Sequence, residues 1–492
     1  MENNFVSLGG RVVTYLDPEY NSLRRGYNYS INQFPYIINY CESEEDIKRA
    51  ILWARGSNIP IRIRGGGHNY EGYSNGNYAF VIDLSLMKNI EINEGENTVT
   101  IQGGVTNKDL YGFLAAYGYP FPGGTCPSVG VFGFALGGGW GLSSRKFGLG
   151  CDNVSEFRMI NYKGEVITAS ANENQDLYWA LRGGGGGNFG VVTSITFNLP
   201  PKIEEVTLIE IDYENVNPRQ QEKLFLAWQN YVAKNNENLT LISRIYNSKE
   251  EGLSMLVRGF YYGEAEEVRN LLKEFLETGN PIYNIQKMPF IEAVNIIGSS
   301  YPQNEKFRSA SGFVYRRLTL CEIMCLVNIV KKLPYYSEYI ALSMYALGGK
   351  AGEVKPHDTA FYHRKAGYII WLDTKFEKNM YTTNNQKWID EKYRILRNYT
   401  AGAYVNFPYR NLSHYKEEYY GGNVASLLSV KGKYDPVNVF GFPQGILGNN
   451  SYCYEESPYP QEGLSLEEER TQEKANYREF RFVKDIKKEN QP

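Results

Sequence analysis

Two dense glycine clusters constrain this chain more than any other feature of its 492 residues. The first covers residues 61–69 and the second covers residues 121–141. Glycine lets the backbone adopt positive φ and leaves N–H groups uncovered, so such segments can lie directly against a flat or anionic ligand. The clusters therefore predict a ligand cradle made of bare backbone, although a glycine-rich turn remains the alternative for the first one.

Composition narrows the classes of protein that the chain can represent. Its length predicts two domains, because one hydrophobic core rarely serves so many residues. The 52 Lys and Arg against 55 Asp and Glu give a net charge of −3, and no basic block occurs, which argues against nucleic acid or an anionic membrane as partners. No apolar run approaches the ~20 residues of a membrane-spanning helix. The oligomeric state stays open.

The N-terminus and the cysteines predict where the protein resides. Residues 1–16 show no basic start followed by an apolar run, so they do not resemble a secretory signal. The six cysteines are scattered, which argues against a disulfide framework. We therefore expect a cytoplasmic protein.

The pattern of elements predicts an α+β fold. Residues 1–200 alternate short strands and helices, including a helix over 43–57 with Ser43 as its cap, and Pro200-Pro201 marks a boundary. Residues 201–400 predict an antiparallel sheet flanked by helices, residues 401–447 return to the first domain, and residues 448–492 form a polar tail of unknown role. In the second domain, strands are predicted over 206–213, 239–246, 253–262, 339–347 and 367–376, and helices over 218–234, 264–277, 321–332 and 382–398.

Several motifs match a known pattern but lack its context. Residues 185–190 fit the dinucleotide fingerprint, yet a helical pattern precedes them and a strand follows. Residues 72–76 fit a nucleophile elbow, but a strand-like segment follows, so Ser74 is a poor nucleophile. Cys321 and Cys325 have helical spacing amid apolar residues, which favours core packing. The four histidines are widely separated, so no metal site is predicted.

Each glycine cluster contains a residue that can react. His68 follows three glycines, and Arg64 precedes them with a charge suited to a pyrophosphate. Cys126 lies in the second cluster, where its reactivity depends on thiolate character, which nearby backbone N–H dipoles favour.

These segments resemble the berberine bridge enzyme-like branch of the FAD-binding PCMH (vanillyl-alcohol oxidase) superfamily. The resemblance spans roughly residues 5–446, and it implies a PCMH-type FAD-binding domain followed by a substrate domain. It also implies that FAD is bound twice, from His68 to the flavin 8α-methyl and from Cys126 to ring carbon C6. The matching segments are residues 64–68, 124–130, 136–141, 145–149 with 152–154, 182–192 and 434–440.

Two bonds at the benzenoid end of the ring would fix its position and rotation and leave N5 open to substrate. The two covalent bonds should also make the flavin a stronger oxidant. The hydride transfer itself is the chemistry of the cofactor. Besides His68 and Cys126, the predicted flavin contacts are Arg64, Gly65, Gly66, Gly67, Asn69, Ser74, Gly124, Val129, Gly130, Gly133, Gly141, Val192 and Asn406.

Oxidation of a C–OH group also needs a base for the hydroxyl proton, which contributes roughly 10²–10⁴-fold. In the resembling family this is often the last residue of a Tyr-x-Asn-Tyr segment, where this chain has Phe407. A phenyl ring cannot accept a proton, so Tyr404 and Tyr409 become the hypothesis, with core packing as the alternative for each. The sheet of the second domain should cover the flavin, and Tyr345 and residues 359–364, with His363 and Arg364, are candidates to stack on sugar or polyketide rings, with packing on a helix as the alternative.

The resulting interpretation is an oxidase that converts a hydroxyl of a small molecule, a sugar or a secondary metabolite, and reduces O₂ to H₂O₂. A dehydrogenase of the same fold with another electron acceptor is the second hypothesis. A flavin-bearing binding protein without turnover is the third, and the Phe407 departure is its only support.

Overall fold

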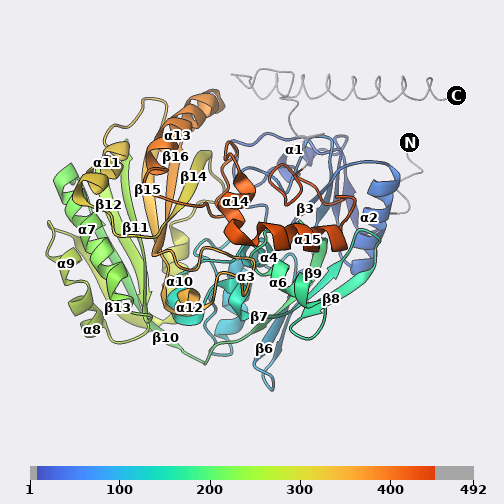
Figure 1. Ribbon diagram of the computed structural model, residues 1–492, viewed down its shortest axis with the longest axis horizontal. Helices are drawn as coiled ribbons and strands as arrows, with labels where there is room; N and C mark the ends of the chain where they lie inside the picture. The colour runs from blue at the N-terminus through green and yellow to red at the C-terminus, as the bar shows by residue number, and fades with distance from the viewer. Residues whose placement is uncertain (1–7, 449–492) are drawn as a thin grey trace.

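The computed structural model describes residues 8–448, which form two lobes that lie side by side (Figure 1). The first lobe begins with a four-stranded sheet in which three strands are parallel and β1 is antiparallel to β2. Helix α2 (Glu44–Gly56) connects the second and third strands along the chain, and the predicted Ser43–Asp46 capping box is present. In sheet order the strands are β1 (Arg11–Val13), β2 (Ile37–Tyr40), β4 (Phe80–Asp83) and β3 (Ile61–Arg64).

A five-stranded antiparallel sheet completes the first lobe. In sheet order its strands are β5 (Ile90–Asn93), β6 (Thr98–Gln102), β9 (Val191–Asn198), β7 (Val154–Ile160) and β8 (Val166–Ser170). The helices of this lobe are α1 (Tyr20–Leu23), α3 (Asn107–Ala115), α4 (Val131–Leu136), α5 (Ser144–Phe147), α6 (Gln175–Leu181) and the 3₁₀ helix η2 (Gly150–Asn153).

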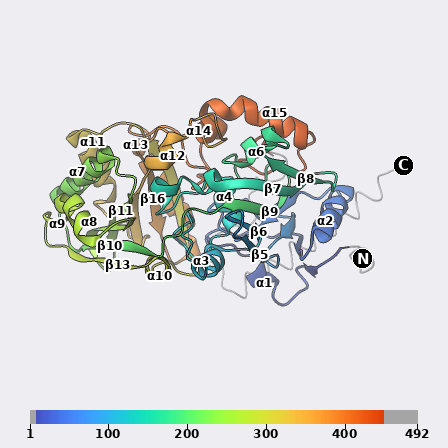
Figure 2. The same ribbon diagram turned by 90° about the horizontal axis from the view of Figure 1, so that it is seen from below.

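The second lobe is a seven-stranded sheet whose neighbouring strands are all antiparallel. In sheet order they are β13 (Ile282–Pro289), β10 (Glu205–Tyr213), β12 (Gly252–Tyr261), β11 (Leu239–Ser248), β15 (Tyr339–Ala346), β16 (Tyr368–Lys375) and β14 (Phe307–Val314). Helices cover the face that points away from the first lobe (Figure 2). They are α7 (Pro218–Lys234), α8 (Ala265–Leu271), α9 (Lys273–Leu276), α11 (Leu320–Val330) and α13 (Thr382–Leu396), while α10 (Phe290–Ser299) and α12 (Gly349–Glu353) lie near the first lobe.

The two faces of this sheet differ in polarity. Arg244 of β11 is paired with Ser343 of β15, which is paired with Trp371 of β16, so these three side chains share one face. Because side chains alternate along a strand, Asp373 and Lys375 lie on that same face. The residues between them belong to the buried apolar core under the helices. The polar face therefore points towards the first lobe.

The chain returns to the first lobe after β14 and α13, in the arrangement that the sequence predicted for residues 401–447. Ala401 bridges to Phe313, and helices α14 (Tyr415–Tyr420) and α15 (Val424–Tyr434) follow, joined by the 3₁₀ turn η4 (Gly421–Asn423). Another 3₁₀ turn, η3 (Asn379–Tyr381), precedes α13. Helix α15 packs against α6, and Lys433 forms an ion pair of 2.7 Å with Asp176. The predicted tail lies outside the described residues from 449 onward.

In the second lobe, the strands β13 and β14 and the helices α10 and α12 were not predicted. The edge strand β13 has a mostly exposed pattern, and β14 carries the small residues Ser309, Ser311 and Gly312, so neither has a strong apolar signal. The helix predicted over 264–277 is divided at Leu272 into α8 and α9.

The prediction of core packing for Cys321 and Cys325 is wrong, because both are exposed on the outer side of α11. The buried residues of that helix are Ile323, Leu326, Val327, Ile329 and Val330. The apolar stretch is thus longer than the stripe that the core needs. All five cysteines within residues 8–448 are free.

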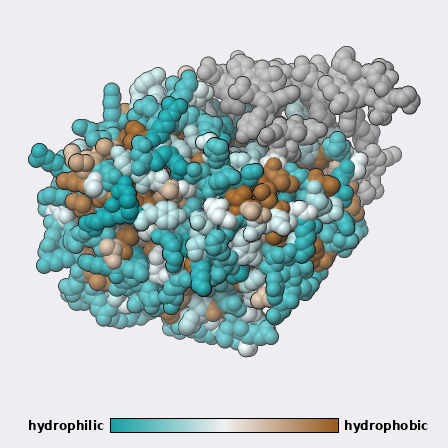
Figure 3. Space-filling view, viewed as in Figure 1, coloured by the Kyte–Doolittle hydropathy of each residue, from teal (hydrophilic) through white to brown (hydrophobic). Residues whose placement is uncertain are grey.

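The surface seen in Figure 3 is mostly hydrophilic, with apolar residues in scattered groups. Within residues 8–448, no helix is both long and apolar enough to cross a membrane. The same residues contain no cluster of three or more potential metal ligands among His, Cys, Asp and Glu.

Candidate active site

A cavity of about 380 Å³ lies between the glycine-rich segments of the first lobe and the polar face of the seven-stranded sheet. Both glycine clusters line it, and so do residues 185–190, whose rejected dinucleotide pattern lies between α6 and β9 as expected. Residues 404–408 close one side. Four segments far apart in the sequence thus converge on one space.

The two glycine clusters touch each other backbone to backbone. A Cβ added to Gly130 would lie 2.6 Å from the backbone nitrogen of Gly66, closer than real atoms approach. Gly67 has φ of +69°, which only glycine adopts readily. Gly133 differs, because a Cβ there would meet no atom within 4 Å. Its open side faces the cavity.

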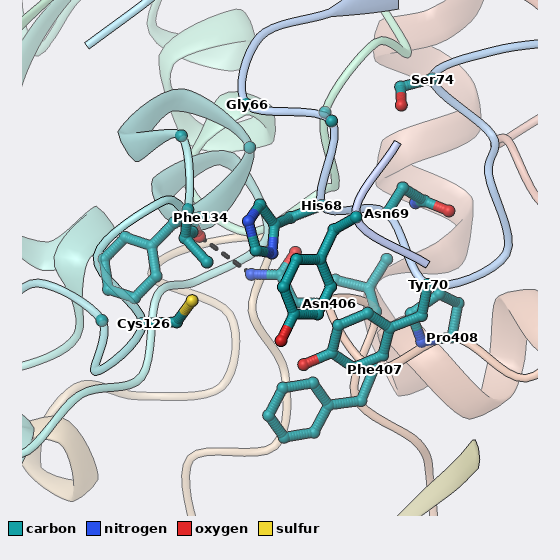
Figure 4. A pocket seen from close by; sticks show the side chains of 18 of the residues that line it. Gly66, His68, Asn69, Tyr70, Ser74, Cys126, Phe134, Asn406, Phe407 and Pro408 are labelled. Carbon is teal, nitrogen blue, oxygen red and sulfur yellow. Dashed lines mark hydrogen bonds between the residues drawn. The ribbon is translucent and has the colours of Figure 1, made fainter. Parts of the chain in front are cut away.

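His68 and Cys126 line this cavity together and share one neighbour. The Oγ of Ser128 lies 2.9 Å from His68 Nε2 and 3.5 Å from Cys126 Sγ. The ring of Tyr27 stacks on the imidazole at 4.1 Å between centroids, which fixes its plane. Figure 4 shows both reactive residues on one side of the space and Tyr70, Phe407 and Pro408 on the other.

Burial controls the protonation of both reactive groups. It lowers the pKa of His68 to about 4, so the imidazole is neutral and nucleophilic at neutral pH. Burial raises the pKa of Cys126, although hydrogen bonds from Ser128 and from the Val129 N–H oppose this shift. Burial thus outweighs the N–H dipoles, which favours the thiol over the thiolate in the protein alone.

The structure brings most of the predicted flavin contacts to the cavity. Those that line it are His68, Cys126, Gly65, Gly66, Gly67, Asn69, Ser74, Gly124, Val129, Gly130, Gly133, Val192 and Asn406. Gly141 does not line the cavity. Its role is steric, because a Cβ there would lie 1.8 Å from the carbonyl oxygen of Gly123.

Arg64 is also absent from the cavity wall, which corrects its predicted role at a pyrophosphate. Its Nε donates to the carboxylate of Asp83, and both side chains are buried. A guanidinium already paired inside the lobe is held away from a ligand. Arg62, which the sequence reasoning missed, lines the cavity and donates to the Gly441 carbonyl at 2.6 Å.

Neither tyrosine proposed as the base has the required geometry. The hydroxyl oxygen of Tyr404 accepts hydrogen bonds from the N–H groups of Gly139 and Trp140 and from Asn406 Nδ2, at 3.1–3.2 Å. These donors occupy its lone pairs, and burial raises the pKa of Tyr404 to about 12. Tyr404 is therefore uncharged, and its hydroxyl helps to position Asn406. Asn406 also donates to the Phe134 carbonyl at 2.9 Å (Figure 4).

Tyr409 lies outside the cavity wall, and its hydroxyl donates to Asp390 at 2.6 Å. Burial and this carboxylate raise its pKa. Phe407, in contrast, lines the cavity and stacks on Tyr70 with 7° between the ring planes. Phe407 thus contributes an aromatic ring to the cavity wall at the position where the tyrosine base was expected.

The second lobe contributes Tyr345 as predicted, but not residues 359–364. His363 contacts the Tyr315 hydroxyl at 2.6 Å and the Glu418 carbonyl at 2.8 Å. Arg364 donates to Asp152 through both terminal nitrogens at 2.6 and 2.7 Å. These residues join the two lobes instead of covering the cavity.

Sequence reasoning missed the charged residues on the polar sheet face. Arg244, Arg258, Glu305 and Lys375 all line the cavity. Part of the signal was present in the predicted strands, since Trp371, Asp373 and Lys375 occupy alternate positions of β16. What the sequence lacked was evidence for which face of the sheet meets the first lobe.

Asp373 lies on the same sheet face but behind the cavity wall. It lies between Trp371 and Lys375, which both line the cavity, and is 1% exposed. Neither carboxylate oxygen has a hydrogen-bond partner within the described chain. Burial raises its pKa to about 7, with Lys375 and Arg244 opposing the shift. Such a carboxyl group can take up and release a proton near neutral pH.

Comparison with known proteins decides the family. Residues 35–170 match the FAD binding domain family, and residues 403–447 match the family described as berberine and berberine like. The uncharacterized FAD-linked oxidoreductase YgaK of Bacillus subtilis is 37% identical over 447 residues, which is 89% of this chain and 97% of that protein. This chain belongs to the berberine bridge enzyme-like FAD-linked oxidoreductases.

More distant relatives and solved structures agree with this assignment. Tetrahydroberberine oxidase of Berberis wilsoniae is 28% identical, covering 84% of this chain and 85% of that protein. The BBE-like 1 structure of Physcomitrella patens has a TM-score of 0.83 at 27% identity and covers 90% of this chain and 98% of that one. A chitooligosaccharide oxidase shares the fold, with a TM-score of 0.80 at 24% identity over 89% and 97% of the two chains. The predicted α+β, PCMH-type fold is confirmed.

The cavity fits the FAD that this family carries. The open face of Gly133 leaves the space that a flat ring needs, and the bare backbone of residues 65–67 offers N–H groups to polar atoms. His68 and Cys126 face the same space, with a neutral nitrogen and a thiol as the available groups.

We expect Gly133→Leu to reduce the flavin content of the purified protein by at least about tenfold, because overpacking a site costs roughly 1–3 kcal/mol. The folded apoprotein should persist, since the added side chain enters open space. Flavin absorbance per protein and thermal unfolding measure the two effects. Gly112→Leu is the control, because Gly112 is also helical and open but lies away from the cavity. An unchanged flavin content in Gly133→Leu would contradict the predicted position of the ring.

Proposed function

We propose that this FAD-linked oxidoreductase holds FAD through two covalent bonds, from His68 and Cys126, and oxidises a hydroxyl group of a small molecule with O₂ as the acceptor. The observation that carries the proposal is the placement of both residues on one cavity around a single hydroxyl, that of Ser128. Two attachment groups this close suit one ring system, whose benzenoid end both would reach.

The contacts of His68 indicate which nitrogen forms the bond. Nε2 is engaged by the Ser128 hydroxyl, so Nδ1 is left to attack. When Nε2 carries the proton, Nδ1 has the free lone pair, and Ser128 accepts from Nε2. The same hydroxyl lies within reach of the Cys126 thiol. Ser128 is thus a positioning residue for both attachments.

Ser128→Ala is expected to slow covalent attachment at both residues by about three- to tenfold, the worth of one hydrogen bond of roughly 0.5–1.5 kcal/mol. The measurement is the time course of protein-bound flavin after acid precipitation when apoprotein is mixed with FAD. Ser128→Thr keeps the hydroxyl and should restore the rate. If Ser128→Ala matches the wild type, the shared hydroxyl has no part in attachment.

When bound, FAD accepts a hydride from the substrate carbon. The chain has to orient the substrate and accept the hydroxyl proton. Asp373 is our candidate for the second task, because its carboxylate oxygens have no other partner and its pKa of about 7 lies close to neutral pH. It does not line the cavity itself but lies directly behind the wall, between Trp371 and Lys375. Tyr70, Tyr345, Trp371 and Phe407 form an aromatic wall that excludes water and packs on the substrate.

The names of the relatives support a hydroxylated or oxidisable small molecule as substrate. They include a tetrahydroberberine oxidase, a monolignol oxidoreductase and, among the structures, a chitooligosaccharide oxidase. A screen of sugars and alcohols under anaerobic conditions tests the proposal, with bleaching of the flavin absorbance as the expected result. No bleaching with any compound would favour the binding-protein hypothesis.

Aerobic turnover then separates the oxidase from the dehydrogenase. Release of one H₂O₂ per oxidised hydroxyl supports O₂ as the acceptor. Bleaching that persists in air, and that only an artificial acceptor reverses, would assign the chain to the dehydrogenase alternative.

A further inference from the structure

Three cations on the polar face of the seven-stranded sheet line the cavity, and two of them have carboxylate partners. Arg258 forms an ion pair of 2.7 Å with Asp212, and Lys375 forms one of 2.5 Å with Glu305. Arg244 is the third. Within residues 8–448 it forms no ion pair, although its charge faces the same cavity.

The neighbours of Arg244 fix the position of its side chain but form no ion pair with it. Its Nε donates to Ser343 Oγ at 2.9 Å, and its guanidinium interacts with the hydroxyls of Tyr339 and Tyr345. Burial raises the pKa of both tyrosines, so both are uncharged. Asp373, the remaining acid on this face, attracts Arg244 through its charge but forms no hydrogen bond with it. A guanidinium stays charged in proteins, and an unpaired buried charge costs several kcal/mol.

We propose that Arg244 binds a carboxylate of the substrate, so that the hydroxyl compound oxidised here is an acid. The oxidation itself rests on the function proposed above, whereas the anion site does not. Ser343 engages Nε and two neutral tyrosine hydroxyls contact the guanidinium, so a carboxylate, the anion whose geometry matches a guanidinium, would be its first ion-pair partner. Trp371 shares the sheet face with Arg244, and the ring of Phe407 lies 5.6 Å from that of Trp371. The apolar part of the acid would lie against these rings.

The binding arm of the test uses benzoate and its neutral counterpart benzamide, neither of which has a hydroxyl to oxidise. Each is titrated into the flavin-loaded protein, and the shift of the flavin absorbance gives its affinity. Benzoate should bind at least about tenfold more tightly than benzamide, as expected for charge-assisted hydrogen bonds. Arg244→Gln should abolish this preference, and Arg244→Lys should keep part of it. Arg258→Gln is the matched control and should keep it, because Arg258 already has carboxylate partners.

Three results would overturn the anion site: equal affinity for both probes in the wild type, a preference that survives in Arg244→Gln, or no shift with benzoate at all. The wild-type comparison needs no variant, so a poorly folded Arg244→Gln does not remove the test. The turnover arm compares D-glucuronate with its neutral methyl ester, and the acid should have the higher kcat/KM. Absence of turnover with every hydroxyl compound would count against the proposed oxidation. The relative affinity for benzoate and benzamide would still test the anion site by itself.

Discussion

Asp373→Asn is expected to lower the rate of flavin reduction by roughly 10²–10⁴-fold, the contribution of a positioned base. Asparagine keeps the size of the side chain but cannot accept the hydroxyl proton. The wild-type rate should rise with pH through about 7, because the raised pKa of Asp373 keeps the carboxyl protonated below that value. Anaerobic stopped-flow mixing with a substrate from the screen, over a range of pH, measures both effects.

Glu305→Gln provides the matched comparison, because Glu305 is the carboxylate that lines the cavity directly and is paired with Lys375. Its pH profile should keep the rise near pH 7. A rise that persists in Asp373→Asn and disappears in Glu305→Gln would transfer the base to Glu305.

The stability of the same variant supplies an independent check. The pKa of Asp373 is raised from 3.8 to about 7, so the folded state disfavours the charged form. Stability is therefore lost as pH rises from about 4 to about 7, and the loss persists above that range. Asp373→Asn should thus unfold at a higher temperature than the wild type at pH 8, and this advantage should vanish at pH 4. A loss of stability of this kind is expected when a buried carboxyl group is retained for its role in catalysis.

The double variant His68→Ala/Cys126→Ala should lose all covalently bound flavin. We expect the protein to remain folded, because the glycine cradle and the core do not depend on these side chains. Each single variant should keep one bond and so remain yellow after denaturation in acid or detergent. The fraction of flavin that stays with the precipitated protein measures this directly.

Cys151→Ala is the control for the cysteine, since Cys151 is free and buried but lies beside Arg364 and away from the cavity. It should retain both bonds. Flavin that remains attached to the double variant would show that other residues form the links.

Local signals in the sequence predicted elements well, because they depend on short-range physics. The Ser43–Asp46 capping box marks a helix start that the structure confirms. Helix α7 has the predicted bounds, since Asn217 caps it and Pro218 begins it. The glycine clusters also predicted the cavity, because glycines in such density allow the backbone to lie directly against a ligand.

Partners distant in the sequence were not predictable. Arg64 appeared suited to a phosphate until the structure paired it with Asp83, a partner on the adjacent strand β4. Tyr404 appeared to be a possible base, but the N–H groups of Gly139 and Trp140, more than 200 residues away, occupy its oxygen. Asp373 drew no attention because its raised pKa arises only from burial in the folded chain.

The mass of the intact wild-type protein, measured after denaturation, tests the central claim most directly. Expressed with ample riboflavin, the chain should carry the added mass of one FAD, stay yellow in denaturant, and yield on proteolysis one flavin linked to two peptides, around residues 68 and 126. A colourless denatured protein with the mass of its amino acids alone would contradict this account.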